Sequence, residues 1–179
     1  MADPRTAITL TLENEDRGLT GRITTDNNGF KVKYGINAQD NPDLWDANHP
    51  DGPSLDEAIL RYTSVYWPMS MAQLTSQHVA DMIFDLGVNM GRYHAAQILQ
   101  RAISRLGVTV TIDGVIGAAT VASANTCNEA QLVAAIVAEA DAYYELLAAV
   151  KLEDAPYLKE WLARVKTESM QVDTGLTAE

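Results

Sequence analysis

The sequence contains very little cysteine and histidine. Its one cysteine, Cys127, has no second thiol to pair with, which excludes an internal disulfide. The three histidines, His49, His78 and His94, are scattered, and no two of them stand one helical turn apart, as zinc ligands on one helix face do. We therefore expect no metal ion and no cofactor, and a purely structural role for Cys127.

Positive charge is also scarce in this chain. Lysine and arginine together number 13 against 24 aspartates and glutamates, which gives a formal net charge of -11. So acidic a surface repels phosphate groups, and we expect neither a nucleic acid nor an anionic lipid as a partner. The sequence also lacks a glycine-rich phosphate loop and a serine or cysteine marked by a neighbouring histidine base.

Long apolar runs are absent as well. The opening Met-Ala-Asp-Pro-Arg-Thr is polar and no apolar run follows it, and no stretch reaches the ~18 apolar residues that span a bilayer. We expect a protein that is made in the cytoplasm without a Sec signal peptide and that does not insert into a membrane.

What the chain does have is the composition of a globular domain. With 179 residues, 47% of them hydrophobic, it can bury a core without disulfides or metals. The sequence contains no internal repeat. We expect a single domain over residues 1–179, with a motif and hairpin region at 7–66, a helical region at 70–170 and a flexible tail at 171–179.

The N-terminal region carries three local patterns. Residues 7–13 alternate apolar and hydroxyl side chains, so this segment fits a strand or a short helix. Residues 21–37 predict a β-hairpin, because Asp26-Asn-Asn-Gly29 is typical of a tight turn between two alternating segments. Residues 40–53 are rich in proline and aspartate and predict a loop, in which Trp45 either pins the loop to the body of the protein or faces a ligand.

The rest of the chain predicts helices, about five or six in all. Ser54-Leu-Asp-Glu57 is a capping box that starts a helix running toward Tyr66, and Pro68 follows its end. Further on, apolar residues recur at helical spacing and predict buried faces: Val79, Met82, Ile83, Leu86, Ala95, Ile98, Leu99, Ala102, Ile103, Leu106, Leu132, Val133, Ile136, Val137, Ala140, Tyr143, Tyr144, Leu147, Leu158, Trp161, Leu162 and Val165.

Carboxylates at the end of the first segment are candidates for chemistry. Glu13, Glu15 and Asp16 lie there, and Asp26 lies in the turn that follows. Cleaving a glycosidic bond needs a carboxylic acid that keeps its proton near neutral pH, and a second group that orients water or stabilises the transition state. Partial burial raises a glutamate's pKa, and Glu13, directly after Leu12, is better placed for this than Glu15. The same charged run is also typical of a solvated surface.

Three stretches in the later part of the chain carry a family resemblance. They are 84–91 (Phe-Asp-Leu-Gly-Val-Asn-Met-Gly), 95–101 (Ala-Ala-Gln-Ile-Leu-Gln-Arg) and 112–120 (Ile-Asp-Gly-Val-Ile-Gly-Ala-Ala-Thr). In order and spacing they resemble the C-terminal part of the glycoside hydrolase family 108 muramidases, a part often described as a predicted peptidoglycan-binding domain. Tyr143-Tyr144 and Trp161-Leu-x-Arg164 fall where such proteins carry similar residues.

The resemblance continues into the N-terminal half, so that it covers residues 7–165. In that family a glutamate is followed by Gly-Gly, then by an Asp-x-Gly-Gly turn, then by a Thr-x-x-Gly-Ile element. Here Glu13 matches the glutamate, residues 26–29 match the turn, and Tyr34-Gly-Ile36 matches the last element.

Two departures from the family pattern leave alternatives open. Asn14-Glu15 stands where the family has Gly-Gly, and the register also allows Glu15 at the position of the catalytic glutamate. Val32 stands near the place of the family's threonine, so a hydroxyl that holds water would have to come from Thr24 or Thr25.

The resemblance implies a mainly α, lysozyme-like fold, with a helical body and one small N-terminal β-hairpin. The first segment would be a helix whose C-terminal end presents Glu13 to a cleft beside the hairpin. The implied activity is that of an N-acetylmuramidase, which cleaves the β-1,4 bond between N-acetylmuramic acid and N-acetylglucosamine in peptidoglycan. Glu13 would be the general acid, and Asp26 the electrostatic or water-orienting partner.

Tyr34 and Asn89 are the candidate substrate-binding residues. Tyr34 lies on the hairpin and would stack on a sugar, although a core role fits it equally. Asn89 stands near a helix end before Gly91, where it would bind an acetamido group or cap backbone groups.

Two other functions also fit this sequence. One is a lytic transglycosylase, which uses a single acid and needs no carboxylate to activate water. The other is a non-catalytic peptidoglycan-binding or structural component of a phage particle or secretion apparatus. In each case the expected partner is the glycan strand, and the place of action is the periplasm or cell wall. Delivery there would need a holin, a phage tail or a secretion system, and an inhibitor or immunity protein is a further candidate partner.

Overall fold

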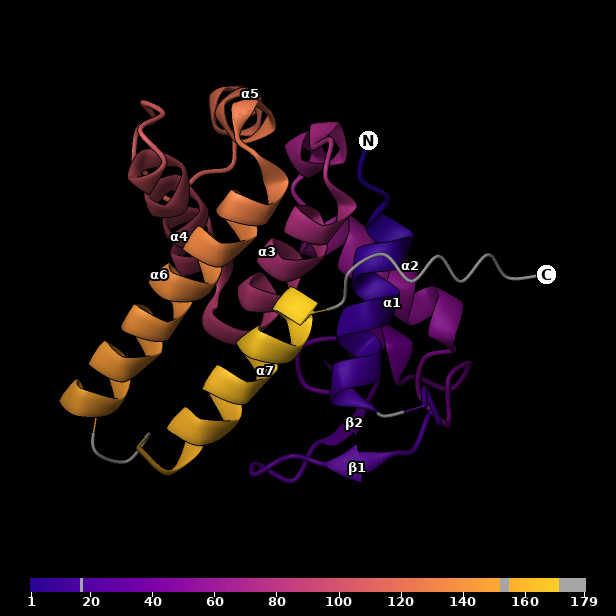
Figure 1. Ribbon diagram of the computed structural model, residues 1–179. Coiled ribbons are helices and arrows are strands. Elements are labelled where there is room, and N and C mark those ends of the chain that lie inside the picture. The colour runs from indigo at the N-terminus through magenta and orange to yellow at the C-terminus, as the bar shows by residue number, and fades with distance from the viewer. Residues whose placement is uncertain (17, 152–154, 171–179) are drawn as a thin grey trace. The chain divides into compact units, whose positions relative to one another are not determined.

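The computed structural model describes residues 1–16, 18–151 and 155–170 (Figure 1). The chain divides into two compact units. The N-terminal unit is Pro4–Trp67, and the helical unit comprises Met1–Asp3 and the chain from Pro68 onward. The boundary lies between the regions 7–66 and 70–170 that the sequence separates. The expectation of a flexible tail at 171–179 lies outside the described residues.

The N-terminal unit begins with α1, Pro4–Glu15. The first segment is therefore a helix, as the resemblance implies, and its buried residues recur on one face: Ala7, Ile8, Thr11 and Leu12. Three short antiparallel strands follow in the order β1 (Thr24–Thr25), β2 (Lys31–Lys33) and β3 (Ile36–Asn37). The predicted hairpin is present, and β3 adds a third strand to it.

The rest of the N-terminal unit contains the 3-10 helix η1, Pro42–Leu44, and α2, Leu55–Val65. The predicted capping box starts α2: the Ser54 side chain accepts a hydrogen bond from the Glu57 N–H, and the Glu57 carboxylate accepts one from the Ser54 N–H. Both reciprocal bonds satisfy backbone donors that the first helical turn leaves without a partner.

The described part of the helical unit beyond Pro68 is built from helices and their connections, of which 106–117 is the longest. The helices are η2 (Met69–Gln73), α3 (Gln77–Met90), α4 (Arg92–Arg105), α5 (Ala118–Thr126), α6 (Glu129–Val150), η3 (Ala155–Tyr157) and α7 (Leu158–Met170). In Figure 1, α6 and α7 lie side by side. The core of this unit includes Ile83, Leu99 and Ile136, which are at most 1% exposed. They belong to three of the helix faces that the sequence predicts to be buried.

A buried ion pair joins α3 to α7. The two carboxylate oxygens of Asp85 accept hydrogen bonds from Nε (2.9 Å) and an Nη (2.7 Å) of Arg164, and Asp85 is 3% exposed. This bidentate geometry gives a buried carboxylate the partner that it needs.

The predicted fold class, mainly α with a small N-terminal sheet and a lysozyme-like architecture, is confirmed. Among the described residues, no helix combines the length and the apolar character needed to cross a bilayer.

Candidate functional site

Two glutamates at the end of α1 point in different directions. Glu13 and Glu15 are both exposed. Successive residues of a helix are rotated by about 100°, so two residues separated by one position lie on nearly opposite faces. Glu15 follows Leu12 by three positions and Thr11 by four, which places it in line with the buried face of α1. Glu13 lies on the opposite face of the helix.

Tyr62 of α2 lies near Glu15. Tyr62 is 4% exposed, and its pKa is raised first by burial and then by the negative charge of Glu15. The Tyr62 hydroxyl also donates a long hydrogen bond (3.4 Å) to the backbone carbonyl of Tyr34, and it lies against Gly35, where a Cβ would overlap it. We call Glu15, Tyr34 and Tyr62 the α1-end cluster, because Tyr62 adjoins the other two.

Tyr34 occupies an unusual backbone conformation. Lys33 and Ile36 pair across β2 and β3, so Tyr34 and Gly35 form the two-residue turn between them. Both have positive φ, 51° and 71°, as a type I′ turn requires. Glycine adopts this conformation freely, but a bulky side chain does so at a cost of about 1 kcal/mol or more, and such residues gather at functional sites. The sequence alone does not reveal this strained conformation of Tyr34.

The half-buried side chain of Tyr34 is held in place by its neighbours. A Cβ at Gly21 would lie only 2.6 Å from the Tyr34 hydroxyl oxygen, so the approach of these two segments requires glycine. Lys33 Nζ lies 5.6 Å from the centre of the Tyr34 ring, within the range of a cation–π contact.

Asp16 organises the loop that leads from α1 to Gly21. Its carboxylate accepts hydrogen bonds from the Thr20 hydroxyl and the Gly21 N–H, both at 2.7 Å. The bond from Thr20 is the main reason why the pKa of Asp16 is lowered. Asp16 thus remains ionised and fixes the loop against which the Tyr34 hydroxyl lies.

Asp26 holds the first hairpin turn. One carboxylate oxygen accepts hydrogen bonds from the N–H groups of Asn28 and Phe30, both at 2.9 Å, and the other accepts one from the Asn37 amide at 3.1 Å. Much of the acceptor capacity of Asp26 therefore serves the hairpin itself. Asp26 thus has a structural role in the turn that the sequence predicts at 26–29.

The sheet register places a hydroxyl beside Val32. Thr24 pairs with Val32 across β1 and β2, so both side chains lie on the same face of the sheet as direct neighbours. Of the two candidate threonines, Thr24 is thus the one next to Val32, while Thr25 pairs with Lys31 and points to the other face.

The loop between β3 and α2 contains an ion-pair cluster that the sequence does not predict. His49 Nδ1 lies 2.8 Å from an Asp46 oxygen, and Nε2 lies 3.0 Å from a Glu57 oxygen. The bond to Asp46, followed by that to Glu57, raises the pKa of His49. The Trp45 ring lies against Gly52, where a Cβ would stand 2.6 Å from it, so Trp45 is in contact with its own loop.

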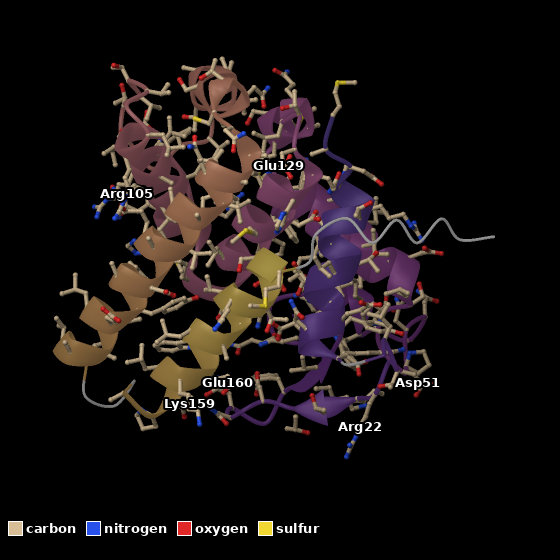
Figure 2. The ribbon with its side chains drawn as sticks, viewed as in Figure 1. Arg22, Asp51, Arg105, Glu129, Lys159 and Glu160 are labelled. Atoms are coloured by element: carbon tan, nitrogen blue, oxygen red, sulfur yellow. The ribbon has the colours of Figure 1, made fainter. Side chains whose placement is uncertain are left out.

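Lys33 and Arg22 are basic residues of the hairpin region. Lys33 Nζ donates to the backbone carbonyl of Asp51 (3.1 Å), which ties β2 to the loop. Figure 2 labels Asp51 and Arg22, which is exposed and points outward beside the hairpin. Within the described segments, no group of three His, Cys, Asp or Glu side chains could hold a metal ion.

Asn89, the second candidate substrate-binding residue, belongs to the helical unit. It is exposed in the last turn of α3 and lines a small pocket together with Asp85, Tyr144 and Arg164. Burial raises the pKa of the Tyr144 hydroxyl in this pocket, and the charge of Asp85 adds to that effect. Cys127 is half-buried, and burial raises the pKa of its thiol, which is typical of an unreactive cysteine.

Similarity to known proteins concerns both the sequence and the fold. Residues 94–166, which run from α4 into α7, match the sequence model of a family described as "Predicted Peptidoglycan domain". The solved structure of SagA from Brucella abortus has a similar fold, with a TM-score of 0.67 over 93% of this chain and 91% of that chain. The two sequences are 19% identical, so this likeness concerns the fold. No curated protein matches the chain. The family match associates the helical unit with peptidoglycan.

Proposed function

We propose that this protein is a peptidoglycan hydrolase that cleaves the β-1,4 bond between N-acetylmuramic acid and N-acetylglucosamine. The observation that carries the proposal is the α1-end cluster, in which a glutamate at a helix end adjoins a buried tyrosine and a strained turn that bears a second tyrosine. The peptidoglycan-domain match in residues 94–166 supports the substrate class.

Glu15 is our candidate for the general acid, with Glu13 as the alternative. The residues before Glu13 favour it in the sequence, but the helical geometry of α1 favours Glu15, which lies in line with the buried face and close to Tyr62. In the free protein Glu15 is exposed. A sugar strand lying over the carboxyl group would remove water from it, and this favours the protonated form that can donate.

The proposed reaction is acid-assisted hydrolysis. Glu15 gives its proton to the glycosidic oxygen, and the bond from that oxygen to the anomeric carbon of N-acetylmuramic acid breaks, with its electron pair staying on the oxygen. The departing N-acetylglucosamine keeps the new hydroxyl group. Water then adds its hydroxyl to the anomeric carbon, and its proton restores the carboxyl group.

Two residues of the sheet are candidates for the second role. Asp26 would stabilise the positive charge of the transition state from its place in the hairpin, although the hairpin already uses much of its acceptor capacity. Thr24 would hold the water, since its hydroxyl lies beside Val32 on the same face of the sheet. Tyr34 would contact the sugar.

Digestion of purified sacculi tests the assignment. We expect Glu15→Gln to reduce the release of reducing ends by about a hundredfold or more, the range typical of a lost general acid. Glu13→Gln is the matched control, because it removes the same charge from the opposite face of α1. A large loss with Glu13→Gln and none with Glu15→Gln would assign the acid to Glu13. Full activity of both variants would refute a glutamate acid at this helix end.

A lytic transglycosylase is the second candidate function. The observation that favours it is the use of Asp26 in the hairpin turn, because a transglycosylase needs no second carboxylate. Mass spectrometry of the same digests separates the two reactions, since transglycosylation leaves an anhydro-muramic end and hydrolysis leaves a reducing end.

A further inference from the structure

Tyr93 is a large aromatic side chain held in a fixed position at the surface of the helical unit. It lies near the start of α4 and is 55% exposed. Its hydroxyl accepts a hydrogen bond from the Gln97 amide at 3.1 Å, and its ring lies against Gly114, where a Cβ would overlap it. The ring is therefore supported on one side, while the residue as a whole stays largely exposed to solvent.

The turn that supports Tyr93 is itself fixed from the core. Gln100 is fully buried; its amide oxygen accepts from the Gly114 N–H (2.9 Å), and its NH₂ group donates to the Asp113 carboxylate (2.7 Å). Gly114 has φ +74° and touches the ring, so glycine is required for two reasons. The turn at Asp113-Gly114 thus holds a tyrosine at the surface. Such pre-organisation lowers the entropy lost on binding.

Tyr93 begins a row of rings. The His94 ring lies 5.5 Å from that of Tyr93, and the Tyr143 ring of α6 lies 5.1 Å from that of His94. His94 and Tyr143 are half-buried. The buried Tyr144 ring continues from Tyr143 at 5.7 Å. We call Tyr93, His94 and Tyr143 the aromatic row.

The electron-rich face of an aromatic ring attracts the weakly positive C–H groups on the face of a pyranose sugar. We propose that the aromatic row, which shares no residue with the α1-end cluster, is a stacking platform for the amino sugars of a glycan strand. Exposed Asn89, which lines a small pocket with Tyr144, the buried neighbour of Tyr143, would pair with an acetamido group. All three rings of the row but no residue of the α1-end cluster lie near or within the peptidoglycan-domain match. The proposal rests on the proposed function only for its choice of ligand.

Retention on insoluble sacculi tests the platform. The sacculi are stripped of protein and anionic polymers, and all proteins carry Glu15→Gln so that they do not digest the ligand. We expect Tyr93→Ala to weaken retention about fivefold or more, as the loss of one stacked ring predicts. Tyr93→Phe keeps the ring, loses only the bond with Gln97, and should retain most of the binding.

Leu146→Ala is the matched control for non-specific adhesion. Leu146 is also on α6, three positions after Tyr143, and is 65% exposed. We expect this variant to bind like its parent. Unchanged retention of Tyr93→Ala would overturn the proposal, and so would an equal loss with Leu146→Ala, which indicates non-specific adhesion or a partner protein. Thermal unfolding of each variant checks that the fold is kept.

A second measurement places the ligand on the row. We expect the ring protons of His94 to shift in NMR spectra as soluble, uncrosslinked glycan fragments are added, and to remain unshifted in Tyr93→Ala. Cleavage is assayed separately with Glu15 intact, on short soluble fragments, where Tyr93→Ala should act like the parent. If Glu15→Gln cleaves like the parent while Tyr93→Ala loses retention, the assignment of Glu15 is refuted and the stacking platform is supported. If Glu15→Gln loses cleavage while Tyr93→Ala keeps its retention, only the platform is refuted.

Discussion

In the helical unit, aliphatic side chains such as Ile83, Leu99 and Ile136 are sealed from water between α3, α4 and α6. In the N-terminal unit, by contrast, strands of two or three residues are held by carboxylates that accept hydrogen bonds, such as those of Asp16 and Asp26. Apolar packing of this kind does not depend on pH and does not require a particular bond direction. Hydrogen bonds to carboxylates depend on charge and on geometry, and they can hold an exposed acid and a strained turn in fixed positions. We therefore expect single substitutions to affect the stability of the two units in different ways.

The largest effect should come from the buried Asp85–Arg164 pair of the helical unit. Arg164→Ala leaves the Asp85 carboxylate buried without its main partner, and we expect a loss of about 3–5 kcal/mol in the free energy of unfolding, measured by urea denaturation. Arg105→Ala is the control: Arg105, labelled in Figure 2, pairs with Glu139 at the surface, and its loss should cost about 1 kcal/mol or less. Equal losses would show that burial of the Asp85–Arg164 pair is unimportant.

A gain of stability should follow from Asp81→Asn, also in the helical unit. Burial raises the pKa of Asp81 to about 6. A carboxyl group whose folded pKa lies above its unfolded value of 3.8 favours folding less and less as pH rises between these two values. The neutral amide avoids this, and it can still accept from Gln77. We expect a gain of up to about 3 kcal/mol near pH 7.5 and almost none near pH 4, by urea denaturation at both values. A lower stability than the parent near pH 7.5 would contradict the effect of burial.

A smaller, local loss is expected in the N-terminal unit from Asp26→Ala. The change removes the acceptor for the N–H groups of Asn28 and Phe30, and we expect a cost of about 1–2 kcal/mol confined to the hairpin. Hydrogen exchange should speed up at the Phe30 amide and stay unchanged in α4 and α6. Asp40→Ala removes the same charge from the neighbouring exposed loop and should leave the Phe30 amide unaffected. Faster exchange throughout the helical unit would show that the two regions are not independent in this respect.

The smallest effect is the pH response of the loop around His49. The pKa of Glu57 is lowered to about 2, chiefly by the Ser54 hydroxyl, so its contribution is lost as pH falls below its ordinary value of 4.5. The pKa of His49 is raised, so its contribution is complete below the ordinary value of 6.5 and is lost as pH rises through the raised one. Protection from hydrogen exchange in residues 46–57, taken relative to the intrinsic exchange rate at each pH, should therefore be greatest between pH 4.5 and 6.5. His49→Gln should remove the change on the alkaline side; an unaltered profile would exclude His49 as its cause.

The sequence predicts the helical unit well because its stabilising contacts repeat along each helix. Ile98, Leu99, Ala102 and Ile103 recur at helical spacing, and all four are buried. The start of α2 is equally readable, since the two members of its capping box are three residues apart.

The structure of the N-terminal unit is harder to predict from the sequence, because its hydrogen bonds join residues at irregular spacings. Glu57 meets His49 across a loop eight positions long, and Asp16 binds backbone groups whose positions depend on the loop itself. The strain at Tyr34 arises only once β2 and β3 pair. The choice between Glu13 and Glu15 also depends on α1 being a helix, a point that the alternating pattern of its residues leaves open.

The Asp85–Arg164 pair also sets limits on how the chain can be divided. A fragment trimmed to the family match at 94–166 would contain Arg164 but neither Asp85 nor the rest of α3. Such a piece would expose the apolar faces of α4 and α6 that α3 covers, and it would aggregate or stay unfolded. Any shortened version meant for expression must therefore begin before Gln77, well upstream of where the sequence similarity starts.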